Sequence, residues 1–298
     1  MAVVLITGAG SGFGAVTARI LAAAGHTVYA SMRAVAGRNA ERAAALLSWG
    51  RENAADLHVV ELDTGDEDSA RAAVATVVAE QGTLDVLVNN AGMLVIGPTE
   101  AFTPEQVAQC FDVNVLGHLR VNRAVLPRMR AQGGGLIVYV GSVTSEIISP
   151  FQGPYVAAKA AEDRLAETTF YENSAFGIDA VIVQPGAYTS GTDHFAGARH
   201  PDDTERAEVY SGLRKRVEEL AATLDSLAEP GVRTDVDEVA ERIRDLIAME
   251  PGRRPFRTVV DPQHHGAQEC NAVRGDMQRA MLERMGMADV LTVRTRNS

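Results

Sequence analysis

The sequence predicts a doubly wound α/β fold, in which helices cover both faces of a seven-stranded parallel sheet. Seven short apolar runs alternate with helical stretches along the chain, which is the pattern of repeated β-α units. A glycine-rich turn follows the first of these runs directly. The chain has 298 residues, 46% of them hydrophobic, which is enough to bury one large core. We therefore expect one α/β domain rather than two.

The first predicted strand, residues 3–6, is a β-branched run that leads straight into a glycine-rich turn. An apolar helical segment, residues 15–24, follows and ends at Gly25. In this context the glycines allow the backbone to approach a pyrophosphate, whose charge lies at the helix N-terminus. The alternative is a turn with a purely structural role. We predict a dinucleotide site that includes Gly8, Ser11, Gly12, Phe13 and Gly14.

The second predicted strand, residues 26–31, carries the information on cofactor choice. An NAD site normally has an acid about 20 residues past the glycine motif, where it holds the ribose 2′-hydroxyl. No Asp or Glu occurs before Glu41, and Arg33 stands at the expected place, with Arg19 and Arg38 in the same stretch. Arg33 could meet a 2′-phosphate with help from the nearby serine hydroxyl, so we predict NADP(H). The alternative is that Arg33 is a solvated loop residue.

Two further strands end in residues suited to a cofactor. Asp63 follows the third strand, residues 57–62, where its carboxylate could accept a hydrogen bond from the adenine amino group. Its alternative role is that of an acid at a helix N-terminus. The fourth strand, residues 84–88, ends in N-N-A-G, whose small residues would let the chain pass close to the cofactor. The residues expected there are Asn90, Ala91 and Gly92.

Tyr155 and Lys159 are four residues apart, so on a helix they share one face. An ammonium beside a phenol stabilises the phenolate, so we expect the pKa of Tyr155 to lie below its reference value of about 10. Such a tyrosine could exchange a proton with a substrate oxygen near neutral pH. Ser142 follows the fifth strand, residues 135–140, and lies thirteen residues before the tyrosine. Taken alone, Ser142 is ordinary turn chemistry.

Over residues 2–261 the chain resembles the short-chain dehydrogenase/reductase family, whose members have a Rossmann fold. The matching residues are Thr7, Gly8, Gly12 and Gly14 of the turn, Asn89 to Gly92, Asn114, Ser142, Tyr155, Lys159, Pro185 and Gly186. Their order and spacing together are specific. The extended members of the family need glycine at position 11, where Ser11 stands, so the chain is more similar to the short single-domain branch.

The resemblance implies catalytic roles for four residues. Ser142 would hydrogen-bond the substrate carbonyl, and Tyr155 would be the general acid in reduction and the base in oxidation. Lys159 would lower the pKa of the tyrosine and hold the nicotinamide ribose. Asn114 would anchor a water that links Lys159 to solvent. The alternative for Asn114 is a helix-kinking or buried amide.

After the sixth strand, residues 178–183, the resemblance implies a loop that meets the nicotinamide carboxamide. Family members use a threonine five residues after the proline, and here Ser190 holds that place. The neighbouring Thr189 and Thr192 leave the contacting hydroxyl open. The cofactor contacts expected from this loop are Pro185, Gly186, Tyr188 and Ser190.

Two stretches are predicted to be additions to a catalytic domain of residues 1–261. Residues 188–234 hold a helical segment, Glu205 to Leu227, and would form a substrate lid over the carboxyl ends of the strands. Residues 262–298 would form a C-terminal helical extension, in which a helix from Val273 to Met285 carries a methionine stripe. Such a stripe would cover the pocket or form an oligomer contact.

The expected pocket lining is apolar. The lid, residues 93–98 and residues 146–152 would surround the substrate, and they contain Leu94, Ile96, Ile147, Ile148 and Phe151. This lining favours an apolar or aromatic ketone over a highly charged one.

Composition limits the remaining possibilities. No apolar run approaches the length of about 18 residues that a membrane helix needs, and the first strand leaves no room for a signal peptide. The two cysteines, Cys110 and Cys270, give no disulfide framework, so we expect a cytoplasmic protein. The net charge of −11 argues against nucleic acid as a partner. His264 and His265 are adjacent and lack accompanying carboxylates, so no metal site is expected.

The leading hypothesis is an NADPH-dependent carbonyl reductase that interconverts a ketone or aldehyde with an alcohol. An alternative is an NAD-dependent alcohol dehydrogenase, which the missing acid disfavours. A non-catalytic NADP(H)-binding sensor is a further alternative, disfavoured because all four catalytic-type residues are present. The resemblance also implies a homodimer or homotetramer.

Overall fold

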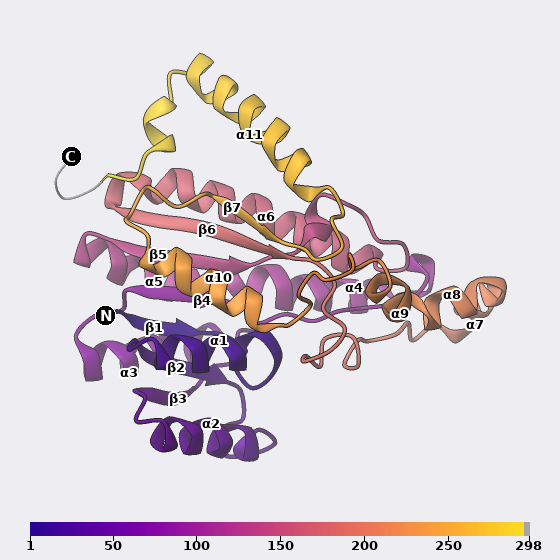
Figure 1. Cartoon of the computed structure of the whole chain (residues 1–298), viewed down its shortest axis with the longest axis horizontal. Helices are drawn as coiled ribbons and strands as arrows, with labels where there is room; N and C mark the ends of the chain where they lie inside the picture. The colour runs from indigo at the N-terminus through magenta and orange to yellow at the C-terminus, as the bar shows by residue number, and fades with distance from the viewer. Residues whose placement is uncertain (295–298) are drawn as a thin grey trace.

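The structure is a computed structural model and describes residues 1–294. Its seven strands form one parallel sheet in the order β3-β2-β1-β4-β5-β6-β7, which confirms the predicted doubly wound fold (Figure 1). The order reverses between β1 and β4, where such sheets bind ligands at the carboxyl ends of their strands. The strands are β1 (Val3–Ile6), β2 (Thr27–Met32), β3 (Leu57–Glu61), β4 (Val86–Asn89), β5 (Gly135–Val140), β6 (Ile178–Pro185) and β7 (Arg257–Val260).

Helices cover both faces of the sheet because its strands are apolar on both sides. In β1, Val4 and Ile6 join a core cluster with α1, α2 and α10, while Val3 and Leu5 join a second cluster with α3, α5 and α6. The helices of these layers are α1 (Gly12–Ala23), α2 (Ala40–Glu52), α3 (Glu67–Gln81), α5 (Gly117–Gln132), α6 (Gly153–Asn173) and α10 (Asp237–Ala248). The short α4 (Pro104–Phe111) leads into α5 through one π-helical turn, Asp112–Leu116.

The lid region is more broken than the sequence indicates. The single helical segment expected from Glu205 to Leu227 is divided into α7 (Thr204–Val209), α8 (Arg214–Glu218) and α9 (Leu220–Asp225). A 3₁₀ turn that contains Gly212 separates α7 from α8, since glycine weakens a helix interior. In Figure 1 these short helices lie beyond one end of the sheet.

The C-terminal extension contains α11 (Ala267–Arg284), which begins six residues earlier than predicted. Its predicted methionine stripe is exposed, with Met277 at 66% and Met281 at 46% of full exposure, so it does not cover the pocket. On another part of the helix, Arg274 contacts the carboxylates of Glu146 and Asp163. Through these ion pairs α11 is tied to the turn that follows β5 and to α6. None of the helices within residues 1–294 has the length and apolar character to cross a bilayer.

Candidate active site

A cavity of about 1330 Å³ opens at the carboxyl ends of the strands, at the point where the strand order reverses. The sequence-predicted residues that line it are Gly8, Ser11, Gly12, Phe13, Arg33, Asp63, Asn90, Ala91, Gly92, Ser142, Tyr155, Lys159, Pro185, Gly186 and Tyr188. The predicted cofactor and catalytic residues therefore come together around one space. The three that do not line it are Gly14, Asn114 and Ser190.

The glycine turn packs too closely against the end of β4 to hold side chains. Gly8 has φ of +65°, and a Cβ atom there would lie 2.8 Å from the Cα atom of Ala91. At Gly14, a Cβ would lie 2.5 Å from Nδ2 of Asn90. Gly14 therefore acts through close packing of α1 against the strand ends, while the rest of the turn faces the cavity.

Thr7 joins the turn to β4. Its buried hydroxyl accepts hydrogen bonds from the backbone N–H groups of Asn90 and Ala91, at 2.9 and 3.0 Å. The Asn90 side chain donates in return to the carbonyl oxygen of Thr7, at 2.8 Å. These bonds fix the opening through which a dinucleotide would approach.

Three arginines line the cavity, namely Arg33, Arg38 and Arg42. The side chain of Arg33 is exposed at the end of β2. Sequence reasoning missed Arg42, which lies on α2 and reaches Asp193 of the lid region at 3.2 Å. Arg19, in contrast, does not line the cavity. The cavity lining thus carries positive charge in a protein whose net charge is −11.

Asp63 lies in the turn after β3 and faces the cavity. Its carboxylate accepts a hydrogen bond from the backbone N–H of Gly65, at 2.9 Å. The alternative prediction made Asp63 an acid at a helix N-terminus, but Asp66 has that position. Asp66 caps α3 by accepting a hydrogen bond from the N–H of Asp68 at 2.8 Å. Asp63 is therefore left facing the cavity next to Thr64 and Gly65.

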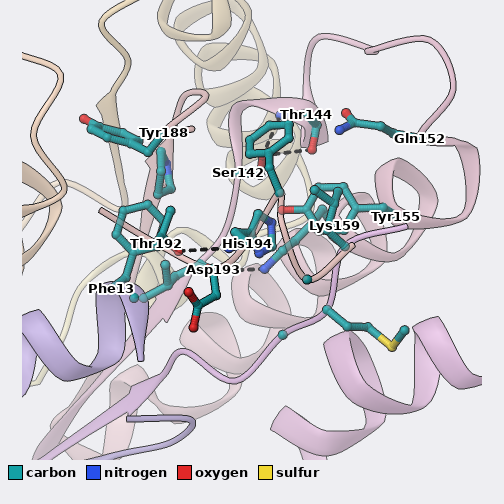
Figure 2. A pocket seen from close by; sticks show the side chains of 18 of the residues that line it. Phe13, Ser142, Thr144, Gln152, Tyr155, Lys159, Tyr188, Thr192, Asp193 and His194 are labelled. Atoms are coloured by element: carbon teal, nitrogen blue, oxygen red, sulfur yellow. Dashed lines mark hydrogen bonds between the residues drawn. The ribbon is translucent and has the colours of Figure 1, made fainter. Parts of the chain in front are cut away.

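Ser142, Tyr155 and Lys159 face one another on the deep side of the cavity (Figure 2). All three are at least nine-tenths buried. The Lys159 ammonium lies 6.0 Å from the centre of the Tyr155 ring and donates a hydrogen bond to the carbonyl oxygen of Val140, at 2.8 Å. The Ser142 hydroxyl accepts a hydrogen bond from the Thr144 hydroxyl at 2.9 Å, which leaves its own proton free for another acceptor.

The expected lowering of the Tyr155 pKa is wrong for the protein alone. Burial raises the pKa of the Tyr155 phenol, and this effect outweighs the attraction of the Lys159 ammonium. A buried negative charge, Glu162, adds to the increase. The sequence argument considered the lysine and omitted both the burial and the acid.

Glu162 and His118 are the functional neighbours that sequence reasoning missed. A Glu162 oxygen lies 2.8 Å from the Lys159 nitrogen, and the other oxygen lies 3.1 Å from Nδ1 of His118. Neither contact has the angles of a hydrogen bond, so both act through charge and proximity. The available signal was the spacing, because Glu162 follows Lys159 by three residues and so shares its helix face.

Asn114 lies in the π-helical turn between α4 and α5 and is fully buried. Its side-chain amide donates to the carbonyl oxygens of Met93 and Cys110, at 3.0 and 2.9 Å, and its oxygen accepts from the N–H of Met93 at 3.1 Å. The alternative reading of a buried amide in an irregular helix is thus present in the structure. Asn114 fixes the chain after β4 from behind the cavity wall.

The loop after β6 places its hydroxyls differently from the expectation. Ser190 lies away from the main cavity and lines a small separate hollow with Val236. Thr192 lines the main cavity, with its hydroxyl next to Gly12. Of these two residues, Thr192 is the one that lines the main cavity. Tyr188 is buried and packs edge-on against Phe13, with ring centres 5.5 Å apart.

The loop also brings His194 against Tyr155, as Figure 2 shows. Their ring centres are 5.7 Å apart. Burial, and then the charge of Lys159, lower the pKa of His194 to about 4, so its ring is neutral at pH 7. Sequence reasoning did not single out His194, because nothing in the loop sequence shows which side chain turns inward.

Apolar side chains line the outer part of the cavity. Leu94, Ile147, Ile148 and Phe151 do so as expected, while Ile96 does not. The lid contributes Leu220, Leu224 and Leu227 from α9 and its end. Within residues 1–294, no group of three or more metal-ligating side chains is present, and both cysteines are free.

A family model described as short chain dehydrogenase matches residues 2–202, which is more than half of the chain. The chain belongs to the short-chain dehydrogenase family. A 3-ketodihydrosphingosine reductase of Bacteroides thetaiotaomicron is 35% identical over 189 residues, which cover 63% of this chain and 65% of that protein. Human 17-beta-hydroxysteroid dehydrogenase type 1 is 37% identical over 264 residues, which cover 86% of this chain and 77% of that protein.

Among solved structures, an alcohol dehydrogenase from the archaeon Thermococcus sibiricus, complexed with 5-hydroxy-NADP, has 26% identity and a TM-score of 0.67. The match covers 87% of this chain and 96% of that one. Short-chain dehydrogenases are oxidoreductases that use nicotinamide cofactors. The geometry fits such a cofactor, because the bare backbone at Gly8 and the N-terminus of α1 border the cavity.

Proposed function

We propose that this short-chain dehydrogenase is an NADPH-dependent carbonyl reductase that interconverts a ketone or aldehyde with an alcohol. The observation that carries the proposal is that Ser142, Tyr155 and Lys159 face the same cavity that is also lined by arginines. Because all three catalytic-type side chains are present and directed inward, a sensor without catalysis has less support.

In the proposed reaction the cofactor supplies a hydride to the carbonyl carbon. Ser142 holds the carbonyl oxygen with its free hydroxyl proton, and Tyr155 donates a proton to that oxygen as negative charge develops on it. Lys159 stabilises the resulting phenolate and binds the ribose hydroxyls. Asn114 positions the backbone of Met93 at the cavity wall. The reverse direction uses Tyr155 as a base.

The preference for NADPH rests on charge at the adenosine end. Arg33 and Arg42 line the same cavity as Ser11, and no acid occupies the place after β2 that would hold a ribose 2′-hydroxyl. Guanidinium groups bind phosphate oxygens through charge-assisted hydrogen bonds. Asp63 would accept a hydrogen bond from the adenine. At the nicotinamide end, Thr192 takes the role that was expected of Ser190.

The substrate is proposed to be largely apolar. The outer cavity is lined by leucine, isoleucine and phenylalanine side chains from the lid and from residues 147–151. The names of two relatives, a ketodihydrosphingosine reductase and a hydroxysteroid dehydrogenase, indicate a ketone or hydroxyl group on the substrate. We propose that the lid, residues 188–234, closes over such a molecule.

A homodimer or homotetramer is proposed through the outer faces of α5 and α6. Leu116 at the end of the π-helical turn, Leu119 of α5 and Leu165 of α6 are 42–44% exposed in the single chain. Burying these leucines against a second copy would remove apolar surface from water.

The deciding experiment is a fluorescence titration with NADPH and NADH separately, followed by turnover assays on apolar ketones. We expect NADPH to bind at least about tenfold more tightly, as a 2′-phosphate held by charge would require. Equal affinities or a preference for NADH would contradict the cofactor assignment and favour NAD-linked alcohol oxidation. Binding without turnover of any carbonyl or alcohol would contradict the proposed enzyme.

A further inference from the structure

Behind the catalytic tyrosine lies a buried acid that the proposed reaction does not use. Glu162 is 2% exposed, and its two oxygens lie 2.8 Å from the Lys159 nitrogen and 3.1 Å from Nδ1 of His118. His118 is also 2% exposed. The acid is provided by α6, about one turn after Lys159 and two turns after Tyr155, while the histidine comes from α5. Burying a charge this deeply costs free energy unless an oppositely charged partner compensates it.

The helices and the strand packed around Glu162 each contribute a titratable or aromatic side chain to its surroundings. The Tyr139 ring of β5 lies edge-on to His118, with centres 6.2 Å apart. Burial lowers the tendency of Glu162 to ionise, but Lys159 and then His118 outweigh this effect and lower its net pKa. Glu162 is therefore an anion. The titratable groups that face this cluster are Cys110 of α4, His118 of α5, Tyr139 of β5, and Tyr155 and Lys159 of α6.

His118 lies between the chain after β4 and Glu162. Its Nε2 atom is 2.8 Å from the carbonyl oxygen of Ala91, which can only accept, so Nε2 carries a hydrogen. Its Nδ1 atom lies 3.1 Å from one oxygen of Glu162, and the Lys159 nitrogen lies 2.8 Å from the other oxygen. His118 and Lys159 therefore border the acid through different oxygens.

We propose that Glu162 is a positioning residue whose buried negative charge keeps the proton on the Tyr155–Lys159 pair and so favours carbonyl reduction over alcohol oxidation. Reduction needs the phenol as a proton donor, whereas oxidation needs the phenolate. With Glu162 present, loss of one proton takes the cluster of Tyr155, Lys159 and Glu162 from neutral to negative. Without the acid, the same loss takes it from positive to neutral. The second change is easier in a buried site, whichever group gives up the proton.

This inference rests on the proposed reductase, and Glu162→Gln tests it because glutamine keeps the shape and removes the charge. We expect the pH above which ketone reduction declines to fall by about one pH unit or more, and the pH at which alcohol oxidation begins to fall with it. The pH dependence is measured on kcat/KM for the ketone or alcohol, at saturating cofactor. A shift of the whole profile distinguishes a charge effect from a uniform loss of rate caused by damage to the fold.

Matched variants control the result. Glu167→Gln makes the same change at another buried acid of α6, which pairs with Arg257 instead of Lys159, and should leave the pH profile in place. Glu162→Asp keeps the charge and should restore most of the original profile. If the glutamine variant does not fold, Glu162→Met removes the charge with an apolar side chain of similar size and should show the same shift.

A second measurement needs no substrate. The ultraviolet absorbance of the Tyr155 phenolate, taken as the difference between each NADP-bound protein and its Tyr155→Phe form, should appear at lower pH when Glu162 is glutamine. Unchanged reduction and oxidation profiles in the glutamine or methionine variant would overturn the inference, as would a shift to higher pH. If the unaltered protein reduced no ketone at all, the proposed function would fail while this titration still reported on Glu162.

Discussion

The His194 ring meets the Tyr155 ring edge to face, at 61° and with centres 5.7 Å apart. The histidine comes from the loop after β6 and the tyrosine from α6, so the contact joins the lid region to α6. A neutral imidazole at this place has one donor and one acceptor to offer a substrate beside the reacting oxygen.

His194 should make stability depend on pH. Its pKa falls from 6.5 to about 4 on folding, so between those values the unfolded chain binds a proton that the folded protein does not. The free energy of unfolding should therefore decrease as the pH falls through this window, and the effect is absent above it. Because the side chain borders an open cavity, we expect a contribution of only about 1–2 kcal/mol. Urea unfolding at pH 7 and pH 4.5 measures it.

The control for that measurement is His194→Asn, which cannot titrate. Its stability should change less between the two pH values than that of the unaltered protein. An identical pH dependence in both proteins would show that His194 is already protonated or that the loop opens before the protein unfolds.

Replacing Tyr155 with phenylalanine should remove the proton donor and leave the cavity almost unchanged in shape. We expect kcat for ketone reduction to fall by about 10²–10⁴-fold, as is typical for loss of a general acid, with little change in the dissociation constant for NADPH. Steady-state kinetics and a fluorescence titration give the two quantities. Undiminished turnover in this variant would rule out the phenol as the acid.

Arg33→Ala should weaken binding of NADPH about tenfold more than binding of NADH, because only the former carries the 2′-phosphate. The two KM values, measured on one preparation, provide the comparison. Arg51→Ala is a matched control, since Arg51 is an exposed arginine of α2 that does not line the cavity. An equal effect on both cofactors would remove Arg33 from the phosphate site.

Thr192→Val and Ser190→Ala separate the two candidate nicotinamide contacts. Thr192 lines the main cavity and Ser190 does not, so the valine change should raise KM for the cofactor severalfold while the alanine change should have little effect. The reverse ranking would support the assignment that the family resemblance implied.

The strands, and the residues Ser142, Tyr155 and Lys159 that line one cavity, could be picked out from the sequence because their signals are local. A β-branched run before T-G-x-x-x-G-x-G, or a tyrosine four residues before a lysine, is visible within one element. The number of strands and the doubly wound sheet followed from these patterns. Arg42 and His194 were missed because their approach to the cavity depends on packing between elements distant in the chain.

The prediction of a lowered Tyr155 pKa was wrong for the same reason, namely packing between elements distant in the chain. The lysine that lowers it is four residues away in sequence, but the burial that raises it comes from the lid and from the loop after β4, which cover the ring. The helical spacing from Lys159 could have identified Glu162. It could not have identified His118, which lies on a different helix.

The ion pair between Arg274 and Glu146 joins residues 128 positions apart. It secures the turn after Ser142 only once β6 and β7 have added to the sheet and brought α11 beside α6. Contacts of such long separation form late in folding, because the intervening chain must be ordered first. The close contacts of Gly8 and Gly14, in contrast, are with residues in the first half of the chain. During folding, the nucleotide side of the site should take shape before the side that receives the substrate.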